Sequence, residues 1–405
     1  MVDTTEQQIP DYPMARADRC PFDPPPQLRD LQRETPMAPV RVFSGTSWLV
    51  TRYAEQRALL TDRRVSADMN RPGYPQTVPI GDRAGISPGF IVMDDPEHAR
   101  LRRMVTAPFA IKRIAAMRPA IQQIVDGLID ELLAGPRPAD LVEAFALPVP
   151  SLVICDLLGV PYADHEFFQA NSRRLITRTS SAEERGGAFR ALHGYLDRLL
   201  AEKIAHPRED VLSGLGERVT AGELTHSDAA GMGVLLLIAG HETTANMIAL
   251  GTLALLEHPD QLALLRESGA DDPALVVGAV EELLRYLNIT HNGRRRVALE
   301  DIELGGRTIR AGDGLIIAND IANRDPDAFA EPDRLDLRRD ARHHVAFGFG
   351  IHQCLGQPLA RLELQVVYGT LYRRIPTLAL ATGIDRIPFK HDGAVYGVYE
   401  LPVTW

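Results

Sequence analysis

Apolar side chains recur at the three- and four-residue spacing of amphipathic helices over most of residues 96–285. The same spacing returns in PLARLELQVVYGTLYRR, residues 358–374. Strand-like alternation is confined to shorter stretches before, between and after these two parts. The pattern therefore predicts a mainly α fold with small β-sheets.

Two hairpins are predicted where apolar and polar positions alternate instead. In VRVFSGTSWLVTRY, residues 40–53, Ser44 and Gly45 lie near the turn. Further along, RRRVALEDIELGGRTIRAGDGLIIAN alternates in the same way, with Gly305 and Gly306 marking its turn. The last dozen residues also have the pattern of short strands.

No internal repeat and no long polar linker divides the chain, so we expect a single domain over residues 1–405. The start is rich in proline, through PFDPPPQ. Such a composition predicts an extended N-terminal arm over residues 1–27, laid on the surface or partly loose.

The clearest single element is a long helix from about Thr225 to His258. Thr225 and Asp228 make a capping-box pattern at its start, and Pro259 closes the other end. At about 1.5 Å per residue, some thirty residues give a rod of roughly 50 Å, long enough to cross the whole molecule. Its flanks are apolar on nearly every side, which predicts a buried, central position.

The stretch AGHETTAN, residues 239–246, interrupts this apolar helix. Glycine, an acid and two threonines are poor local choices in the middle of a buried helix. We expect the Thr243 hydroxyl to bond back to the carbonyl of Ala239, which loosens the helical ladder and opens a groove. The alternative is a helix–helix contact made by small residues, with Glu242 satisfied by an arginine. The helix pattern alone leaves both open.

The charge and composition narrow the function classes. A net charge of −10, without any block of basic residues, argues against a nucleic-acid-binding protein. The chain is 45% hydrophobic and 24% charged, which is ordinary for a soluble globular protein. Its start lacks the apolar core of a signal peptide, and the longest apolar stretch stops at His241, short of the roughly 18 residues of a membrane span. We therefore expect a soluble, cytoplasmic protein that does not bind a membrane.

The three cysteines, Cys20, Cys155 and Cys354, are odd in number and far apart, so they predict no disulfide framework. Cys354 lies among glycines and aromatic residues in FGFGIHQCLG, residues 347–356. Glycines let a backbone approach a flat or bulky group that a Cβ would block. Such a cysteine is expected to be a ligand or a nucleophile.

Four kinds of site compete for this loop. Zinc could use Cys354 with His343, His344 or His352, but a structural zinc site usually has two closely spaced ligand pairs. A cysteine nucleophile needs a basic partner that the sequence does not nominate. A nucleotide-binding loop fails on spacing, because Gln353 stands where a third glycine belongs. Haem held by a thiolate uses the glycines and also the helix that begins just after the cysteine, whose N-terminus favours negative charge.

Cationic side chains that could meet two haem propionates are available. His98 and Arg102 lie four residues apart, on one face of a helix that begins after Asp95. For such a pair alone, a solvated basic helix face is the ordinary alternative. Arg296 and His352 complete the set. Haem with cysteine ligation is the option that uses all of these features together.

At this point the chain resembles the cytochrome P-450 superfamily. FGFGIHQCLG matches the family's haem-binding loop at every defining position, and AGHETT matches its oxygen-activating helix. Glu282 and Arg285 match its buried Glu–Arg pair, and His98 and Arg102 match its propionate-binding helix. The motifs follow in the family's order and separations, so the resemblance covers essentially the whole chain. The CPFDPPP opening is similar to soluble bacterial members that oxidise secondary metabolites and foreign lipophiles.

The resemblance implies a single-domain cytochrome P-450 fold with the long central helix over the haem. The cofactor would be haem b, iron-protoporphyrin IX, whose iron is ligated by the thiolate of Cys354. Glu242 and Thr243 would be catalytic and would deliver protons during oxygen activation, and Phe347 would shield the sulfur. The expected cofactor-binding residues are His98, Arg102, Arg296, Phe347, His352, Cys354 and Gly356.

The resemblance also implies residues that serve folding and partner binding. Glu282 and Arg285, with Arg334, would form a structural charge cluster under the haem. Basic patches for an electron donor on the proximal face would include Arg103, Arg342 and Arg361. These three could equally be solvated.

The implied function is a haem-thiolate monooxygenase that inserts one atom of O2, by hydroxylation or epoxidation, into a medium-sized lipophilic substrate. A polyketide, macrolide, terpenoid or steroid would fit. The chain has no flavin or nicotinamide motif, so a ferredoxin and a ferredoxin reductase would supply electrons to a monomer. A non-hydroxylating haem-thiolate redox or gas sensor and a peroxide-driven peroxygenase are the alternatives. The Glu242–Thr243 pair favours the monooxygenase.

The family's geometry implies which segments line the substrate pocket. These are a Pro- and Gly-rich segment over residues 71–90, Leu236, Ala239, residues 288–292 and the turn at residues 395–398. The first of them is expected to act as a mobile gate.

Overall fold

The computed structural model describes residues 9–17, 20–77, 89–268, 272–290 and 292–405, and the structural statements below concern these residues. Helices dominate, as the periodicity predicts. The helices are α1 (Pro26–Glu34), α2 (Tyr53–Thr61), α3 (Glu97–Thr106), α4 (Ile111–Ala116), α5 (Arg118–Ala134), α6 (Pro148–Leu158), α7 (His165–Ile176), α8 (Ala182–Ala205), α9 (Val211–Thr220), α10 (His226–Glu257), α11 (Pro259–Ser268), α12 (Pro273–Leu287), α13 (Asn319–Ala322) and α14 (Gln357–Arg374).

The strands form a five-stranded sheet, a three-stranded sheet and a hairpin. They are β1 (Met37–Val42), β2 (Gly45–Val50), β3 (Val65–Ser66), β4 (Ala139–Asp140), β5 (Arg294–Ala298), β6 (Ile302–Leu304), β7 (Arg307–Ile309), β8 (Gly314–Ile317), β9 (Ala379–Leu380) and β10 (Pro402–Thr404). The large sheet has the order β1-β2-β8-β5-β3, with only β2 and β8 parallel, and the three-stranded sheet has the order β4-β10-β9. The mainly α fold with small sheets is confirmed.

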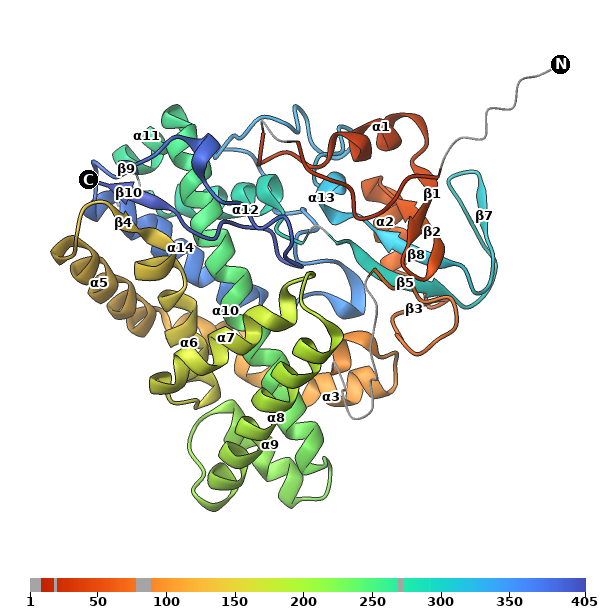
Figure 1. Cartoon of the computed structure of the whole chain (residues 1–405), viewed down its shortest axis with the longest axis horizontal. Coiled ribbons are helices and arrows are strands. Elements are labelled where there is room, and N and C mark those ends of the chain that lie inside the picture. Colours follow the sequence, from red (N-terminus) through yellow and green to blue (C-terminus); the bar gives the residue numbers. More distant parts are fainter. Residues whose placement is uncertain (1–8, 18–19, 78–88, 269–271, 291) are drawn as a thin grey trace.

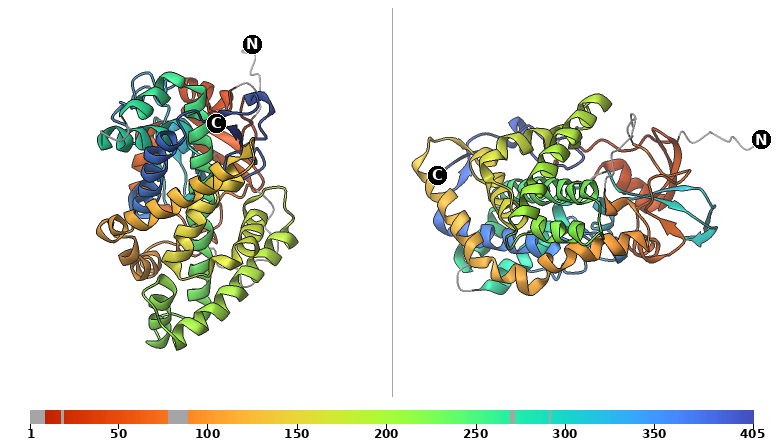
Figure 2. Two further views of the ribbon diagram at one scale, coloured as in Figure 1. Left: turned by 90° about the vertical axis from the view of Figure 1, so that its left-hand side faces the viewer. Right: turned by 90° about the horizontal axis from the view of Figure 1, so that it is seen from below.

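α10 is the central element, as predicted. It runs through the middle of the helical part (Figure 1), and the turned views of Figure 2 show other helices around it. The Thr225 hydroxyl accepts the backbone N–H of Asp228 at 3.1 Å, which caps the N-terminus. The helix is long and apolar enough to cross a bilayer, but 72% of its most apolar window is buried inside the protein. It is therefore a core helix.

Both predicted hairpins are present. β1 pairs with β2 so that Val42 lies opposite Gly45, which leaves a two-residue turn between them. β6 pairs with β7 around Gly305 and Gly306, whose φ angles are +55° and +71°. These angles are in the left-handed region that a side chain disfavours, so the two glycines are needed for this turn.

The N-terminal arm agrees with the prediction only in part. Arg16 is buried and does not lie on the surface. The expected end of the arm at residue 27 is wrong, because α1 begins at Pro26. The fixed φ of proline suits the first turn of a helix, so the proline-rich start ends in a helix instead of continuing as an extended chain. The parts of the predicted arm at residues 1–8 and 18–19 lie outside the described residues.

A buried charge cluster joins α12 to the long connection before α14. Arg285 donates from Nε and Nη2 to the two carboxylate oxygens of Glu282, at 2.7 and 2.8 Å, and neither side chain is exposed. The third member is Arg339, whose Nε donates to Glu282 at 3.2 Å. The prediction of Arg334 is wrong, because its side chain is 60% exposed and pairs with Glu331 at 3.5 Å. Both arginines lie in one connection, and only the path of its turns decides which one faces α12.

Substitutions in this cluster should separate its buried and exposed members. Glu282→Gln should lower the free energy of unfolding by about 3–5 kcal/mol, because it leaves buried guanidinium groups without their carboxylate. Arg339→Met should cost about 1–3 kcal/mol, and Arg334→Met should change stability by less than about 0.5 kcal/mol. Urea unfolding of the three variants measures this order. Equal losses for Arg339→Met and Arg334→Met would contradict the assignment.

Candidate active site

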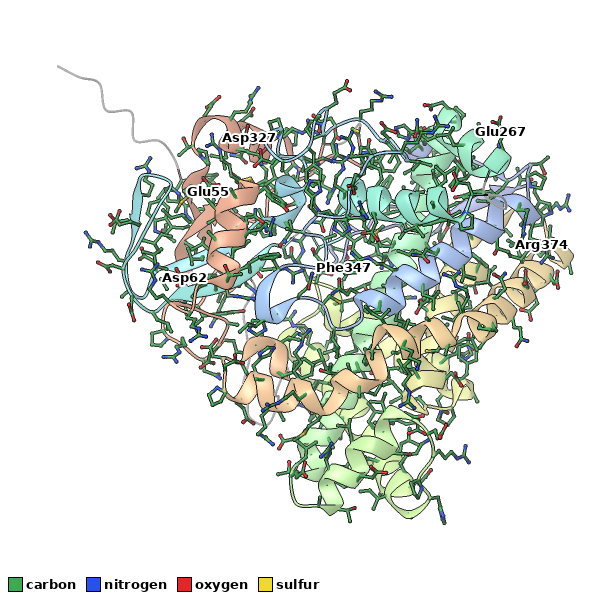
Figure 3. All side chains as sticks on the ribbon, turned by 180° about the vertical axis from the view of Figure 1, so that it is seen from behind. Glu55, Asp62, Glu267, Asp327, Phe347 and Arg374 are labelled. Atoms are coloured by element: carbon green, nitrogen blue, oxygen red, sulfur yellow. The ribbon has the colours of Figure 1, made fainter. Side chains whose placement is uncertain are left out.

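A cavity of about 470 Å³ lies between α10 and the loop that precedes α14. Its lining comes from α3, α10, the loop after α12, β5 and the cysteine loop. Figure 3 labels Phe347, one of the lining residues, near the middle of the molecule. The fold thus brings residues from distant parts of the sequence around one interior space.

The cysteine loop owes its shape to its glycines. Gly348 and Gly350 both have φ of +74°, which favours glycine. A Cβ at Gly350 would collide with the backbone carbonyl of Leu60, and one at Gly348 would press on the guanidinium of Arg294. A Cβ at Gly356 would meet no protein atom within 4 Å. The expectation that the glycines clear space for a flat group therefore fits Gly356, whereas the other two are required by the loop itself.

Cys354 is presented to the cavity just ahead of α14. Its backbone N–H donates to the carbonyl of Phe347 at 2.9 Å, which closes the loop. The side chain is exposed, yet the space it faces is the interior cavity and protein surrounds it. Burial raises the pKa of the Cys354 thiol, while a hydrogen bond from the backbone of Gly356 and the charges of Arg294 and nearby arginines act to lower it.

Cys354 is the cysteine suited to hold a metal ion. Cys155 is buried, and burial raises the pKa of its thiol to about 12, so it stays protonated. In the described ranges, no three or more His, Cys, Asp or Glu side chains are grouped as a metal site. The zinc alternative therefore lacks a ligand set, whereas a single thiolate facing a large cavity suits haem iron.

Phe347 and Arg361 form one wall beside the cysteine. The Arg361 guanidinium lies 4.6 Å from the centre of the Phe347 ring. It also donates to Glu281 at 2.6 and 3.0 Å, and His344 lies 3.1 Å from the same carboxylate. Burial acts to raise the pKa of Glu281, but the hydrogen bonds from His344 and Arg361 lower it to about 2. Arg361 is thus paired with Glu281 while 25% of its side chain stays exposed, so its part in the docking patch stays a prediction.

The other two residues of the predicted docking patch differ from each other. Arg342 is 77% exposed but is paired with Asp340 at 2.8 Å. Arg103 is exposed at the end of α3.

Cationic side chains gather around the cavity, as predicted. Arg102, Arg296 and His352 all line it. His98 is buried and lies behind them, with its ring 4.1 Å from that of His352. Its Nδ1 lies 3.0 Å from Asp95, and no described group bonds to its Nε2. Three of the four residues predicted to bind the propionates therefore line the cavity, and His98 packs behind His352.

β5 contributes more charge than was predicted. Arg294 and Arg295 line the cavity together with Arg296. Burial lowers the pKa of Arg296 to about 10. Burial, with the neighbouring charges of Arg296 and His98, lowers the pKa of His352 to about 3. The RRR run signalled this excess in the sequence, and only the fold shows that all three residues line one space.

Among the residues that the structure describes, no carboxylate is ion-paired with the arginines that line the cavity. Among the described residues that line the cavity, Glu363 is the only carboxyl. Nε of Arg294 is buried without a described partner. Buried cations of this kind need an opposing charge. A cofactor with two carboxylates supplies it, so the cationic cluster, the open space beside Gly356 and the thiol of Cys354 fit haem.

Thr243 and Glu242 face different surroundings. The Thr243 hydroxyl lines the cavity and donates to the carbonyl of Ala239 at 2.8 Å, as predicted. α10 nevertheless stays continuous through this point, so the predicted opening of the ladder is not seen. Glu242 is buried and does not line the cavity, and its carboxylate lies 3.9 Å from Nε2 of His241. Its charge also acts on Lys390, whose pKa burial lowers and Glu242 tends to raise.

The distal wall is built largely as expected. Leu236 and Ala239 of α10 line it, together with residues 288–290. Residues 395–398, which were predicted to complete it, are not among the lining residues. Of the predicted gate, residues 78–88 lie outside the described residues, as does residue 291.

Glu363 of α14 is a site residue that the sequence did not reveal. It lines the cavity, is 1% exposed, and has no described partner for Oε2. Burial raises the pKa of its carboxyl well above the ordinary value. The residue lies within an ordinary helical pattern, so no sequence signal marks it. Burial therefore favours the protonated form of this carboxyl inside the cavity.

Comparisons with known proteins agree on one family. A model described as Cytochrome P450 matches residues 190–375. The chain is 56% identical to Cytochrome P450 GfsF of Streptomyces halstedii, over 100% of both chains. It is 44% identical to the 20-oxo-5-O-mycaminosyltylactone 23-monooxygenase of Streptomyces fradiae, over 97% of this chain and 92% of the relative. The crystal structure of the mycinamicin VIII C21 methyl hydroxylase MycCI from Micromonospora griseorubida, bound to mycinamicin VIII, gives a TM-score of 0.92 at 44% identity, over 98% and 100% of the two chains.

Likeness of this extent covers the fold and the site together, and the chain belongs to the cytochrome P450 family. It is a cytochrome P450 monooxygenase, and its cofactor is haem held through a cysteine thiolate. The cation-lined cavity and the cysteine that faces it agree with this cofactor.

The buried acid should make stability depend on pH. Because the folded-state pKa of Glu363 is raised, its contribution to stability is fully present below the unfolded pKa of 4.5 and is lost as pH rises through the folded pKa. Glu363→Gln should therefore raise Tm at pH 8, by the equivalent of about 1 kcal/mol or more, and have little effect at pH 4. Thermal unfolding of the haem-loaded protein at both pH values measures this. A Tm gain that is equal at the two pH values would show that ionisation is not the cause.

Proposed function

We propose that this enzyme inserts one atom of O2, by hydroxylation or epoxidation, into a medium-sized lipophilic secondary metabolite. A polyketide, macrolide, terpenoid or steroid is the substrate class, with electrons from a ferredoxin and its reductase. The observation that carries the proposal is the position of Thr243, which faces a largely apolar cavity that also holds the thiol of Cys354.

The chain's own residues divide the work of holding the cofactor. Cys354 would be the thiolate ligand of the haem, and Phe347 would shield its sulfur from water. Arg102, Arg296 and His352 bind the propionates by charge-assisted hydrogen bonds, with His98 behind His352. Gly356 leaves room for the macrocycle at the start of α14. Bound in this way, haem supplies the reduction and cleavage of dioxygen.

Thr243 and Glu242 have separate parts in proton delivery. The Thr243 hydroxyl donates to Ala239 and so presents an oxygen lone pair toward the cavity, where it can accept and pass on a proton. Glu242, on the far side of the lining, is placed to resupply protons through water. Its carboxylate lies 3.9 Å from Nε2 of His241 and acts electrostatically on Lys390.

The wall above the cysteine loop supports a large lipophilic substrate. Phe90, Leu235, Leu236 and Ile289 give it apolar surface, and Thr290 adds a hydroxyl. Such a wall binds by burial of apolar area, and a few polar groups orient the ligand. Relatives that are 44% identical are named for action on 20-oxo-5-O-mycaminosyltylactone and on mycinamicin VIII. Within the proposed class, a large oxygenated ring of this kind is the first substrate to test.

The electron donor is proposed to dock beside the cysteine loop. Arg103 is exposed there at the end of α3, and Lys112 and Arg113 of α4 add exposed positive charge. A surface of this sign suits an acidic ferredoxin, with steering that weakens as salt rises. We further propose that the enzyme acts as a cytoplasmic monomer, with residues 1–405 as one domain.

The first experiment is a reduced, carbon monoxide difference spectrum, followed by substrate screening. A strongly red-shifted band would support thiolate ligation by Cys354. Macrolide aglycones, terpenoids and steroids are then tested for the spin-state shift that accompanies displacement of water. Hits are incubated with ferredoxin, reductase and ¹⁸O₂. One labelled oxygen in the product supports monooxygenation, whereas a product formed only with peroxide would replace the proposal with a peroxygenase.

Loss of the Thr243 hydroxyl should uncouple the enzyme. In Thr243→Ala, electron consumption should continue while product per electron pair falls roughly tenfold and peroxide is released, because the proton is delivered less well. Thr243→Ser, which keeps the hydroxyl, should recover most of the coupling. Thr252→Ala removes a buried hydroxyl on the same helix outside the cavity and is the matched control. Equal coupling in Thr243→Ala and the unmodified enzyme would refute this role.

A further inference from the structure

The N-terminal arm places a buried arginine against the wall of the cavity. Arg16 is 7% exposed, and its guanidinium lies 3.9 Å from the centre of the Tyr396 ring. Its Nη2 donates to the carbonyl of Asn288 at 3.4 Å, and its Nη1 donates to the carbonyl of Asp23 at 2.9 Å. One side chain thus joins the arm, the loop after α12 and the C-terminal turn.

Both contacts act on a segment that lines the cavity. Asn288, Ile289 and Thr290 follow the last residue of α12 and form part of the distal wall. The backbone N–H of Tyr396 donates to the carbonyl of Ile289 at 2.8 Å. Arg16 therefore holds this loop directly at Asn288 and indirectly through Tyr396. Arg16 itself does not line the cavity.

A second arginine fixes the arm where this loop begins. Arg324 donates to the carbonyl of Phe22 at 3.2 Å and to that of Tyr286 at 2.9 Å, and its guanidinium lies 3.9 Å from the Tyr286 ring. Phe22 belongs to the arm and Tyr286 to the end of α12. The arm is thereby attached at the point from which the cavity-lining loop departs.

Burying an arginine between the arm and the cavity wall costs free energy, unless its guanidinium makes contacts that an apolar side chain could not make. A buried guanidinium loses hydration, and an apolar side chain could fill the same space at less cost. Its distinctive contribution is a planar donor that can bond two carbonyls while stacking on an aromatic ring. Here the two carbonyls come from segments more than 260 residues apart, and one of them begins the cavity wall.

We propose that Arg16 is a positioning residue for substrate selection, which holds the loop at residues 288–290 in the shape that contacts the substrate. The N-terminal arm is then part of the specificity apparatus of the enzyme. The proposal rests on the haem-thiolate cavity and does not depend on which lipophile is the substrate.

The test compares two iron ligands on the haem-loaded protein by difference spectroscopy. Clotrimazole is bulky and extends from the iron to the distal wall, whereas imidazole needs only the iron. In Arg16→Met, the Kd of clotrimazole should rise roughly fivefold while that of imidazole stays within about twofold, because a loosened wall is less preorganised. Arg16→Lys, which keeps the charge, should give an intermediate ratio. The reduced carbon monoxide band should not move in either variant.

Arg137→Met is the matched control, because Arg137 also stacks on an aromatic ring, that of Trp405 at 4.6 Å, and also donates to a backbone carbonyl, away from the cavity. In Arg137→Met, the ratio of the Kd of clotrimazole to that of imidazole should be the same as in the unmodified protein. Tyr396→Leu removes the stacking partner and should shift the ratio in the same direction as Arg16→Met. If Arg16→Met does not fold, Arg16→Lys and Tyr396→Leu decide the question.

Equal changes for both ligands, or an unchanged ratio with a lower Tm, would show that the arm serves stability alone and would overturn the proposal. If the reduced carbon monoxide band of the unmodified protein is not strongly red-shifted, that result would instead count against thiolate ligation and the proposed function. Failure of the proposal for Arg16 is therefore read from the ratio of Kd values, and failure of the proposed function from the carbon monoxide spectrum.

Discussion

Positive charge that has no counterion among the described residues is the constraint on which the site depends. Arg102, Arg294, Arg295 and Arg296 all line one interior cavity, and burial raises the pKa of Glu363, the one carboxyl in its described lining. A protein interior tolerates such a cluster poorly without an anion. The propionates of haem meet this demand, so cofactor binding and the completion of the fold are linked. Burial raises the pKa of the Cys354 thiol, and the charges of Arg294 and Arg102 act in the opposite direction, toward the thiolate.

Arginines with carboxylate partners join distant segments of the chain around the site. Arg285 and Arg339 attach the long connection before α14 to Glu282 of α12, and Arg361 attaches α14 to Glu281. Neither carboxylate belongs to the described lining of the cavity, and both are occupied by hydrogen bonds from these arginines. The cysteine loop is thus supported by arginines that have carboxylate partners, whereas the arginines of the cavity lining remain available for the cofactor. The difference between paired and unpaired arginines separates the framework from the site.

Hydrogen bonds to backbone carbonyls have a similar role on the distal side. Thr243 donates to Ala239 within α10, and Arg16 donates to Asn288 across the fold. In both cases a polar side chain donates a hydrogen bond to a backbone carbonyl, and this bond fixes part of the cavity lining. The first leaves a hydroxyl oxygen toward the reacting space. The second holds a stretch of wall that has no regular secondary structure of its own.

The sequence by itself determined the features that follow from local chemistry. The period of the apolar residues predicted α10 and its caps, the paired glycines predicted the β6–β7 turn, and the cysteine loop with AGHETT identified the cofactor class. Local steric rules and contiguous motifs carry this information within a few residues. Tertiary structure alone decided that Arg339 and not Arg334 completes the cluster, that Arg361 pairs with Glu281, and that Arg16 and Glu363 belong to the surroundings of the cavity. Which of several similar side chains faces a partner depends on the path of the whole chain, because charge pairing is resolved by distance in space and not by spacing in sequence.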